Sequence, residues 1–363
     1  MPQWKVLCFA TLGSGSNEED RIRTLLGPLA PAVHPYTRQS RWRNLAALLR
    51  EIRRTRPDVV VMEGSGIPGG LALLLGRWLH GVRYVVSSGD AVAPFLAMRV
   101  PWLATVFSLY ERLLYRNAAG FIGWTPYLVG RALTYGAPRA MTAAGFAPYG
   151  AAPERRAAVR AQLGIPPDAI VVGLAGSLVW EARRGYCYGM ELVIAARRLT
   201  RRDVRVLILG DGSGKARLEQ LAGDALGRTV LLPGRIAPNE LPGYLAAMDL
   251  GSLPQSTDAV GAFRYTTKIS EYLSAGLPIV TGETPLAYDF DDGWLVRLPG
   301  ESPWDPVYSA ALSQLMETIT REEIGALRAR VPVVTPPVFD RDRQIRTVSA
   351  FVNEICASRV RSG

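Results

Sequence analysis

The sequence has few cysteines and histidines and no long apolar run. Its three cysteines lie far apart and form no CxxC pair, which argues against a disulfide framework and against a zinc site. The longest apolar region, residues 95–109, is interrupted by Arg99 and Pro101 and is shorter than the ~20 residues of a membrane-spanning helix. The first residues lack the charged and then apolar layout of a signal peptide. These absences predict a protein of a reducing compartment, and we expect it in the cytoplasm.

Length and hydrophobic patterning predict two domains. At 363 residues the chain is long for one core and suits two domains of ~150–200 residues. Apolar runs typical of buried strands alternate with helical patterns, which predicts parallel sheets covered by helices. We therefore expect an α/β protein with two Rossmann-like, doubly wound domains facing each other across a cleft, with the ligand at the carboxyl ends of the strands. The predicted boundaries are 1–150, 151–335 and 336–363, the last being a helix that packs back on the N-terminal domain.

The charge is strongly positive, with a net value of +10 and seven arginines between residues 38 and 56. One interpretation is a solvated helix face, since charge says little about fold or specific function. The other is docking on anionic lipid headgroups, assisted by an aromatic and apolar edge. The residues of that predicted edge are Phe95, Leu96, Trp102, Leu103 and Phe107. No nucleic-acid-reading motif accompanies the arginines, so we expect no nucleic acid as partner.

The stretch from Phe263 to Val280, FRYTTKISEYLSAGLPIV, is the most informative part of the chain. Its pattern predicts a short helix that stops at Gly276 and is followed by a buried strand. Lys268 and Glu271 are three residues apart and therefore share one face of that helix. The free N–H groups and positive dipole end of a helix start suit a phosphate, and a carboxylate one turn further in suits a pair of ribose hydroxyls. A sugar nucleotide offers both groups.

Two glycine-rich turns follow predicted strands. The turn at 13–17 precedes a helix with acidic residues in its first turn. It suits a sugar or acceptor hydroxyl better than a tightly held phosphate, and a plain strand-to-helix turn fits equally well. The turn at 210–215 fails both the P-loop pattern and the dinucleotide-binding pattern, and we interpret it as mainly structural.

A third glycine-rich turn, Gly173–Ser177, leads to Arg183 and Arg184. The planar fork of arginine matches the oxygens of a phosphate, so these two side chains are a candidate diphosphate clamp. A solvated surface loop is the alternative interpretation.

A series of runs between Ile165 and Asp292 matches one known family in order and spacing. The runs are LGIPPDAIVVGLAGSL, ARRG, ELVIAARRL, VRVLILGDGSGKARLEQLA, VLLPGRIAPNELPGYLAAMDLGSLP and KISEYLSAGLPIV. This region resembles the donor-binding half of the GT-B glycosyltransferases, specifically the retaining enzymes of glycosyltransferase family 4. The runs GSLVW and CYGMELV look like those of bacterial exopolysaccharide-assembly transferases. The resemblance implies an acceptor-side domain over 1–150 and a nucleotide-sugar donor-binding domain over 151–335.

The resemblance also implies roles for individual residues. Glu271 is expected to hold the ribose hydroxyls, and Arg184, where the family has a lysine before glycine, to neutralise the diphosphate. Thr266 and Thr267 lie at the helix start facing the phosphates, and the geometry of the helix adds Lys268, which we expect to act with Arg184 in catalysis. The turn at 234–236 matches the one whose backbone reads the edge of the base. The other expected nucleotide-sugar contacts are Gly15, Ser177, Arg183, Gly234, Arg235 and Ile236.

The chain departs from the family pattern at several positions. Ser177 stands where an arginine is usual, and Phe263 stands where the first glutamate of the family touches the transferred sugar. We expect Asp258 or nearby backbone amides to replace that glutamate. The family often has a histidine at the end of the fourth strand of the first domain, where this chain ends the run Ser-Ser-Gly with Asp90. Asp90 is therefore our candidate acceptor contact or catalytic base.

The implied activity is retaining transfer of a hexose to a saccharide or lipid-linked saccharide in polysaccharide or glycan assembly, with UDP-glucose or a related UDP-hexose as default donor. In such enzymes the leaving diphosphate helps to deprotonate the acceptor hydroxyl, so groups that bind it more tightly as its charge grows lower the barrier. No metal-binding cluster is apparent in the sequence, and we expect metal independence and no cofactor. Peripheral contact with the inner face of the cell membrane is also expected. Two alternatives stay open: a non-catalytic nucleotide- or glycan-binding relative, and a sugar-nucleotide 2-epimerase.

Overall fold

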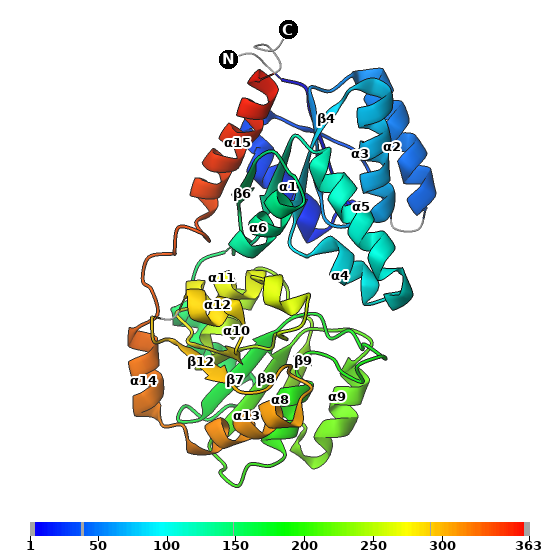
Figure 1. Ribbon diagram of the computed structural model, residues 1–363. Coiled ribbons are helices and arrows are strands. Elements are labelled where there is room, and N and C mark those ends of the chain that lie inside the picture. Colours follow the sequence, from blue (N-terminus) through cyan, green and yellow to red (C-terminus); the bar gives the residue numbers. More distant parts are fainter. Residues whose placement is uncertain (1–3, 38–39, 148, 291, 359–363) are drawn as a thin grey trace. The chain divides into compact units, whose positions relative to one another are not determined.

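The chain divides into two compact units. The computed structural model describes residues 4–37, 40–147, 149–290 and 292–358 (Figure 1). Unit 1 contains the chain up to Gly145, the segment Phe263–Thr266 and the chain from Pro336 onward, and unit 2 contains Phe146–Ala262 and Thr267–Thr335. The segment Phe263–Thr266, here called the FRYT segment, therefore lies in the C-terminal half of the sequence but packs with unit 1. Arg38 of the predicted basic surface lies outside the described residues.

Unit 1 is built on a six-stranded parallel sheet with the strand order β2-β1-β3-β4-β5-β6. Its strands are β1 (Val6–Ala10), β2 (Ala32–Val33), β3 (Val59–Glu63), β4 (Arg83–Ser88), β5 (Gly120–Gly123) and β6 (Ala140–Thr142). Its helices are α1 (Asn17–Leu26), α2 (Arg41–Thr55), α3 (Ile67–His80), α4 (Val92–Ala97), α5 (Ala104–Arg116), α6 (Pro126–Thr134) and α15 (Arg341–Ala357), and a 3-10 turn, Pro101–Leu103, precedes α5.

The core of unit 1 forms because its strands are apolar on both faces. β1 and β3, VLCFA and VVVME, are buried along their whole length, as expected for a parallel sheet covered on both sides by helices. Phe9 of β1 stacks on Tyr36 with ring centres 5.7 Å apart. The final helix α15 belongs to this unit and packs against α1, where the Ser349 hydroxyl donates to the carbonyl oxygen of Leu25 at 2.9 Å.

Unit 2 contains a second six-stranded parallel sheet, with the strand order β12-β11-β10-β7-β8-β9. Its strands are β7 (Ile170–Ala175), β8 (Val204–Leu209), β9 (Val230–Gly234), β10 (Leu250–Leu253), β11 (Ile279–Gly282) and β12 (Leu295–Leu298). Its helices are α7 (Arg156–Gln162), α8 (Met190–Ala196), α9 (Lys215–Ala222), α10 (Leu241–Ala246), α11 (Thr267–Ser274), α12 (Pro285–Asp289), α13 (Pro306–Thr318) and α14 (Arg321–Ala329).

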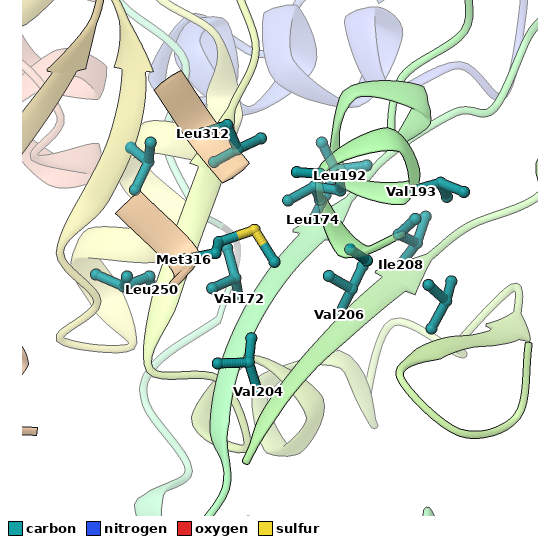
Figure 2. Close-up of a cluster of buried hydrophobic side chains, with 14 of the residues drawn as sticks. Val172, Leu174, Leu192, Val193, Val204, Val206, Ile208, Leu250, Leu312 and Met316 are labelled. Atoms are coloured by element: carbon teal, nitrogen blue, oxygen red, sulfur yellow. The ribbon is translucent and has the colours of Figure 1, made fainter. Parts of the chain in front are cut away.

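The core of unit 2 lies between this sheet and the helices α8 and α13. Figure 2 shows Val172 and Leu174 of β7 and Val206 of β8 beside Leu192 of α8 and Met316 of α13, and all five belong to one buried cluster. The prediction of two doubly wound α/β domains is confirmed by the two parallel sheets and their covering helices.

The predicted apolar edge at 95–107 is wrong at Phe107, which is buried. Phe107 lies on the inner face of α5 with Glu111 and Leu114, because residues three and four apart share a helix face. The exposed apolar residues of this region follow the same spacing on the opposite side and are Trp102, Val106, Leu109 and Leu113. In the described part of the chain, no helix is both long and apolar enough to span a membrane.

Candidate active site

The carboxyl ends of the strands in unit 2 hold Lys268 and Glu271, which both lie on α11 as predicted. The side chain of Lys268 lies against the end of β7, because a Cβ atom on Gly176 would stand only 2.8 Å from Lys268 Cε. The Lys268 ammonium lies 5.3 Å from the ring centre of Tyr188. The missing side chain of Gly176 leaves room for Lys268, and a cation–π contact with Tyr188 holds its positive charge at the start of α11.

Glu271 lies one turn further along α11. Burial raises the pKa of Glu271 above its ordinary value, while Lys268 and the hydroxyl of Tyr149 oppose the rise. A mostly buried carboxylate beside a cation is suited to accept charge-assisted hydrogen bonds from hydroxyl groups. Thr267 is the first residue of α11, and Thr266, the last residue of the FRYT segment, has a buried Oγ1 without a hydrogen-bond partner.

The arginine hairpin, residues 181–186, carries Arg183 and Arg184. The backbone N–H of its first residue donates to the carbonyl oxygen of its last at 2.8 Å. Gly185 takes a φ of +60°, a left-handed conformation that glycine adopts at little cost. Arg183 is exposed and Arg184 is partly buried, so the turn presents two guanidinium groups in different surroundings.

Arg184 is held by two carboxylates and an aromatic ring. Its Nη1 donates to Glu181 Oε2 at 3.1 Å and its Nη2 to Asp258 Oδ2 at 2.8 Å. The guanidinium lies 4.4 Å from the ring centre of Trp304. Burial alone would raise the pKa of Asp258, but backbone N–H groups, a serine hydroxyl and Arg184 together hold it below its ordinary value. A diphosphate bound at this hairpin would compete with these carboxylates for the arginine fork.

The remaining residues predicted for unit 2 are spread along the same ends of the strands. Ser177 follows β7 and is exposed. Gly234 ends β9 with a φ of +90°, and Arg235 and Ile236 follow it. Because β8 lies between β7 and β9, the turn at 234–236 is two strands away from Ser177.

The glycine-rich loop at 210–215 packs closely on the backbone that follows β7. A Cβ atom on Gly210 would stand 1.8 Å from the carbonyl oxygen of Gly176, and one on Gly212 would stand 2.5 Å from that of Leu178. This close backbone approach needs glycine, which gives the loop a packing role.

A buried ion pair lies at the carboxyl ends of the strands in unit 1. It was not predicted from the sequence. Arg21 Nη1 of α1 donates to Glu63 Oε2, at the end of β3, at 2.6 Å, and it also donates to Ser87 Oγ at 3.2 Å. Trp124 Nε1 donates to the other carboxylate oxygen of Glu63 at 3.0 Å, and its ring centre lies 4.4 Å from the Arg21 guanidinium. The only sequence signal is a glutamate that closes the otherwise apolar strand VVVME.

Glu18, on the same helix as Arg21, has one carboxylate oxygen that is buried without a hydrogen-bond partner. Burial raises the pKa of Glu18 to about 8, and the carboxylates of Glu63 and Asp90 add to the rise. A Cβ atom on Gly64 would stand 2.8 Å from the buried oxygen, so Glu18 reaches over the end of β3.

The two residues predicted for this edge, Asp90 and Gly15, differ in their surroundings. Asp90 follows β4, and its Oδ1 accepts a hydrogen bond from Arg264 Nε of the FRYT segment at 2.5 Å. Gly15 has a φ of +75°, and its N–H donates to Glu19 Oε2 at 2.8 Å. Asp90 therefore lies with Glu18 among the carboxylates of the edge, while Gly15 shapes the turn before α1.

Phe263 anchors the FRYT segment on unit 1. Its ring packs against the apolar core of that unit and lies 5.6 Å from the guanidinium of Arg131. Its carbonyl oxygen accepts a hydrogen bond from Thr125 Oγ1 at 2.9 Å. The residue at the position of the family's first glutamate is thus part of the packing of unit 1.

The described residues contain no group of three or more histidine, cysteine or acidic side chains that could hold a metal ion. His34 is buried and pairs with Glu51, and His80 ends α3. His34 directly follows β2, where its backbone N–H donates to the carbonyl oxygen of Cys8 at 2.8 Å.

Two family models match the chain, a glycosyl transferase 4-like domain over residues 5–144 and a glycosyl transferases group 1 domain over residues 169–318. The chain belongs to the GT-B glycosyltransferases and is family 4-like. The resemblance to GT-B glycosyltransferases of family 4 is therefore confirmed. This glycosyltransferase has no match among the curated proteins.

Solved structures with the fold of this glycosyltransferase cover nearly the whole chain. Alr3699/HepE from Anabaena in complex with UDP aligns with a TM-score of 0.69 and 18% identity, over 98% of this chain and 100% of that one. WaaG, a glycosyltransferase involved in lipopolysaccharide biosynthesis, aligns with 0.67 and 12%, over 95% and 99%. A putative UDP-N-acetylglucosamine 2-epimerase from Listeria monocytogenes aligns with 0.61 and 14%, over 98% of each chain. At these identities the likeness shows the fold alone.

Proposed function

We propose that this glycosyltransferase moves a hexose, with retention of configuration, from UDP-glucose or a related UDP-hexose to a saccharide or lipid-linked saccharide in glycan assembly. The observation that carries the proposal is the arrangement on α11, where Lys268 lies against Gly176 and Glu271 lies one turn further along. A cation at a helix start suits a diphosphate, and the carboxylate suits the ribose. A structure of similar fold, HepE, was solved in complex with UDP.

The proposed chemistry depends on binding the leaving diphosphate. Lys268 and Arg184 are the cations assigned to it, and each is fixed by contacts with an aromatic ring and with neighbouring groups. Preorganised positive charge stabilises the negative charge that grows on the diphosphate as the bond to the sugar breaks. The leaving diphosphate then takes the proton of the acceptor hydroxyl on the face where the bond breaks, so a protein nucleophile is not required.

The test is an assay with a panel of UDP-hexoses and saccharide acceptors, with the anomeric configuration of the product read by NMR. Each reaction is run with a chelator and again with magnesium or manganese. We expect transfer from one UDP-hexose, the same anomeric configuration in donor and product, and equal rates with and without metal. An inverted product, or activity that is lost on chelation and restored by metal, would contradict the proposed mechanism.

A non-catalytic nucleotide-binding relative is the second candidate, and the packing of Phe263 favours it. Phe263 occupies the position of a glutamate that the family uses on the transferred sugar, and its ring is committed to the core of unit 1. The same panel separates the candidates, because a binding relative would bind UDP and form no product with any donor. An epimerised nucleotide sugar in reactions without acceptor would instead identify a 2-epimerase.

We further propose peripheral contact with an anionic membrane through unit 1. The helix α5 and the turn before it carry exposed apolar side chains at the spacing of one helix face, with Trp102 81% exposed and Leu109 59% exposed. Arg112 and Arg116 are exposed on the same helix. Exposed apolar residues beside cations are typical of helices that lie in a membrane interface. We call this set the α5 stripe, and its members are Trp102, Val106, Leu109 and Leu113.

A basic cavity of about 390 Å³ supports the same proposal. It lies where α2 and α3 end, and its charged and titratable lining residues are Arg53, Arg56, His80 and Arg83. Trp78 and Leu79, just before His80, are exposed. Trp78 Nε1 donates to Asn117 Oδ1, at the end of α5, at 3.4 Å, so the cavity and the α5 stripe belong to neighbouring helices. Arginines around a cavity suit the phosphate of a lipid headgroup.

A further inference from the structure

The arginine hairpin is anchored from below by a buried carboxylate. Tyr186, the last residue of the hairpin, donates its hydroxyl to Glu191 Oε2 at 2.7 Å, and both side chains are buried. The Tyr186 ring centre lies 5.3 Å from that of Trp304, and Trp304 in turn lies 4.4 Å from the guanidinium of Arg184. A continuous set of contacts therefore leads from Glu191 through Tyr186 and Trp304 to Arg184.

The surroundings of Glu191 favour its neutral form and shift its ionisation toward neutral pH. The residue lies at the start of α8 with no exposed surface. Burial raises the pKa of Glu191 to about 7, while the Tyr186 hydroxyl and the backbone N–H groups of residues 191 and 189 favour the ionised form. The other titratable groups that it influences are Cys187 beside the hairpin, Tyr272 of α11 and Tyr308 of α13.

We propose that Glu191 is a positioning residue for the arginine hairpin, whose ionised carboxylate holds Tyr186 and thereby fixes Arg184 for the diphosphate of the donor. The proposal rests on the proposed function, because it takes Arg184 as a donor-binding group. Glu191 itself is buried beneath the hairpin and acts only through Tyr186 and Trp304.

The direction of the effect follows from the strength of the hydrogen bonds. A carboxylate accepts charge-assisted hydrogen bonds that are roughly twice as strong as those to a neutral group. When Glu191 is ionised, the bonds from Tyr186 and from the Gly189 N–H, at 3.1 Å, hold the hairpin firmly. Protonation weakens both bonds. Affinity for the diphosphate of a nucleotide sugar should therefore rise as pH increases through the neutral range.

The first experiment measures how the conformation of the arginine hairpin depends on pH in the absence of a donor. Trp304 lies between Tyr186 and Arg184, so its fluorescence reports their positions. We expect a transition centred near pH 7 in the wild-type protein that is missing in Glu191→Gln and in Tyr186→Phe. Trp304→Phe identifies the signal, and Glu322→Gln, an exposed carboxylate on α14, is the matched control that keeps the transition. A wild-type transition that persists in Glu191→Gln, or no transition near neutral pH, would overturn the proposal.

The second experiment measures binding of UDP-glucose at pH 6 and pH 8. Both phosphates of this probe are esterified, so its own charge is constant over that range. We expect the wild-type protein and Glu322→Gln to bind about threefold or more tightly at pH 8, and Glu191→Gln to bind equally at both values. Equal pH dependence in wild type and Glu191→Gln would refute the proposal. If UDP-glucose does not bind at all, the assigned donor fails, and the fluorescence titration still decides the role of Glu191.

Discussion

Arg264 Nε donates to Asp90 Oδ1 at 2.5 Å, which joins the FRYT segment to the loop after β4. Each of the two side chains is about one quarter exposed, at 26% and 25%. Arg264 stands three residues before the first residue of α11 in the sequence. One carboxylate of unit 1 is therefore bound by the segment that leads into the proposed ribose-binding helix. A carboxylate oxygen accepts hydrogen bonds, so Asp90 offers an acceptor for the hydroxyl of a saccharide.

We predict that Asp90→Asn lowers kcat/KM for the acceptor by about tenfold to a hundredfold, the range for losing a hydrogen bond to a charged group. The KM for the donor should change by less than about twofold, because the amide keeps the size of the side chain and the donor residues lie elsewhere. Initial rates with each substrate varied in turn make the comparison. Unchanged acceptor kinetics would remove Asp90 from the acceptor site.

The turnover rate kcat should depend on the shape of the Arg184 side chain as well as on its charge. Arg184→Lys keeps the charge but loses the planar fork that reaches Glu181 and Asp258. We expect it to lower kcat by about tenfold, and Arg184→Ala by roughly a hundredfold or more. Arg198→Ala, an exposed arginine after α8, is the matched control and should keep wild-type kcat. If Arg184→Ala keeps its kcat, the clamp assignment is wrong.

Glu271→Ala should raise the KM for the donor by about tenfold to a hundredfold, since two hydroxyl groups lose a charged partner. The variant should fold, and Glu271→Gln should melt at a slightly higher temperature than wild type at pH 7. Because burial raises the pKa of Glu271, the ionised form costs stability as pH rises above the unfolded value, and the amide removes that cost. Donor kinetics and thermal melts of the same preparations test both statements. Wild-type donor kinetics in Glu271→Ala would refute the ribose assignment.

Local sequence patterns predicted the helix that carries Lys268 and Glu271, because a polar start, an apolar face and a glycine stop all lie within one short stretch. The same holds for the strand-helix alternation of both sheets. Short strands such as Ala32–Val33 and Ala140–Thr142 could not be predicted, because two or three residues carry no periodic signal. Their positions are set by pairing with β1 and β5.

Contacts between side chains that are far apart in the sequence could not be predicted. Arg21 and Glu63 are 42 residues apart, and no local pattern links an arginine on a helix to a glutamate that ends a strand. The packing of Phe263 could not be predicted for a related reason, because only three residues separate it from α11 while its ring packs in unit 1. Phe107 is different, since the three- and four-residue spacing already contained the signal that it shares the buried face of α5 with Leu114.

Ionisation of Glu18 should lower the stability of the protein as pH rises. Its pKa is about 8 in the folded protein against an ordinary value of 4.5, so the folded state keeps a proton that the unfolded state has lost. The contribution of Glu18 to the free energy of unfolding is then fully present below about pH 4.5 and is lost as pH rises through about 8. We predict that Glu18→Gln raises Tm at pH 8 by about 2 °C or more and has little effect at pH 4.5.

Asp20→Asn is the matched control for Glu18→Gln, because Asp20 is an exposed acid in the same helical turn. It should leave the pH dependence of Tm as in wild type. Thermal melts at several pH values make the comparison. Parallel Tm profiles for wild type and Glu18→Gln would mean that Glu18 ionises normally in the folded protein.

The last prediction concerns the membrane surface of unit 1. Vesicles that contain phosphatidylserine should sediment with the wild-type protein, and vesicles of phosphatidylcholine alone should not. Each basic residue near an anionic surface contributes about 1 kcal/mol, so Arg53→Ala combined with Arg56→Ala should weaken binding by roughly tenfold or more. Trp102→Ala combined with Leu109→Ser should weaken it as well, because these side chains supply the most exposed apolar surface of the α5 stripe.

The controls for this prediction come from unit 2. Val334→Ser removes an exposed apolar side chain, and Arg198→Ala removes an exposed arginine; neither should change binding. If the controls weaken binding as much as the unit 1 variants, the attraction reflects net charge spread over the whole protein. If both pairs of unit 1 variants bind like wild type, the cavity and the α5 stripe are not a membrane surface, and a lipid-linked acceptor would have to reach the enzyme in another way.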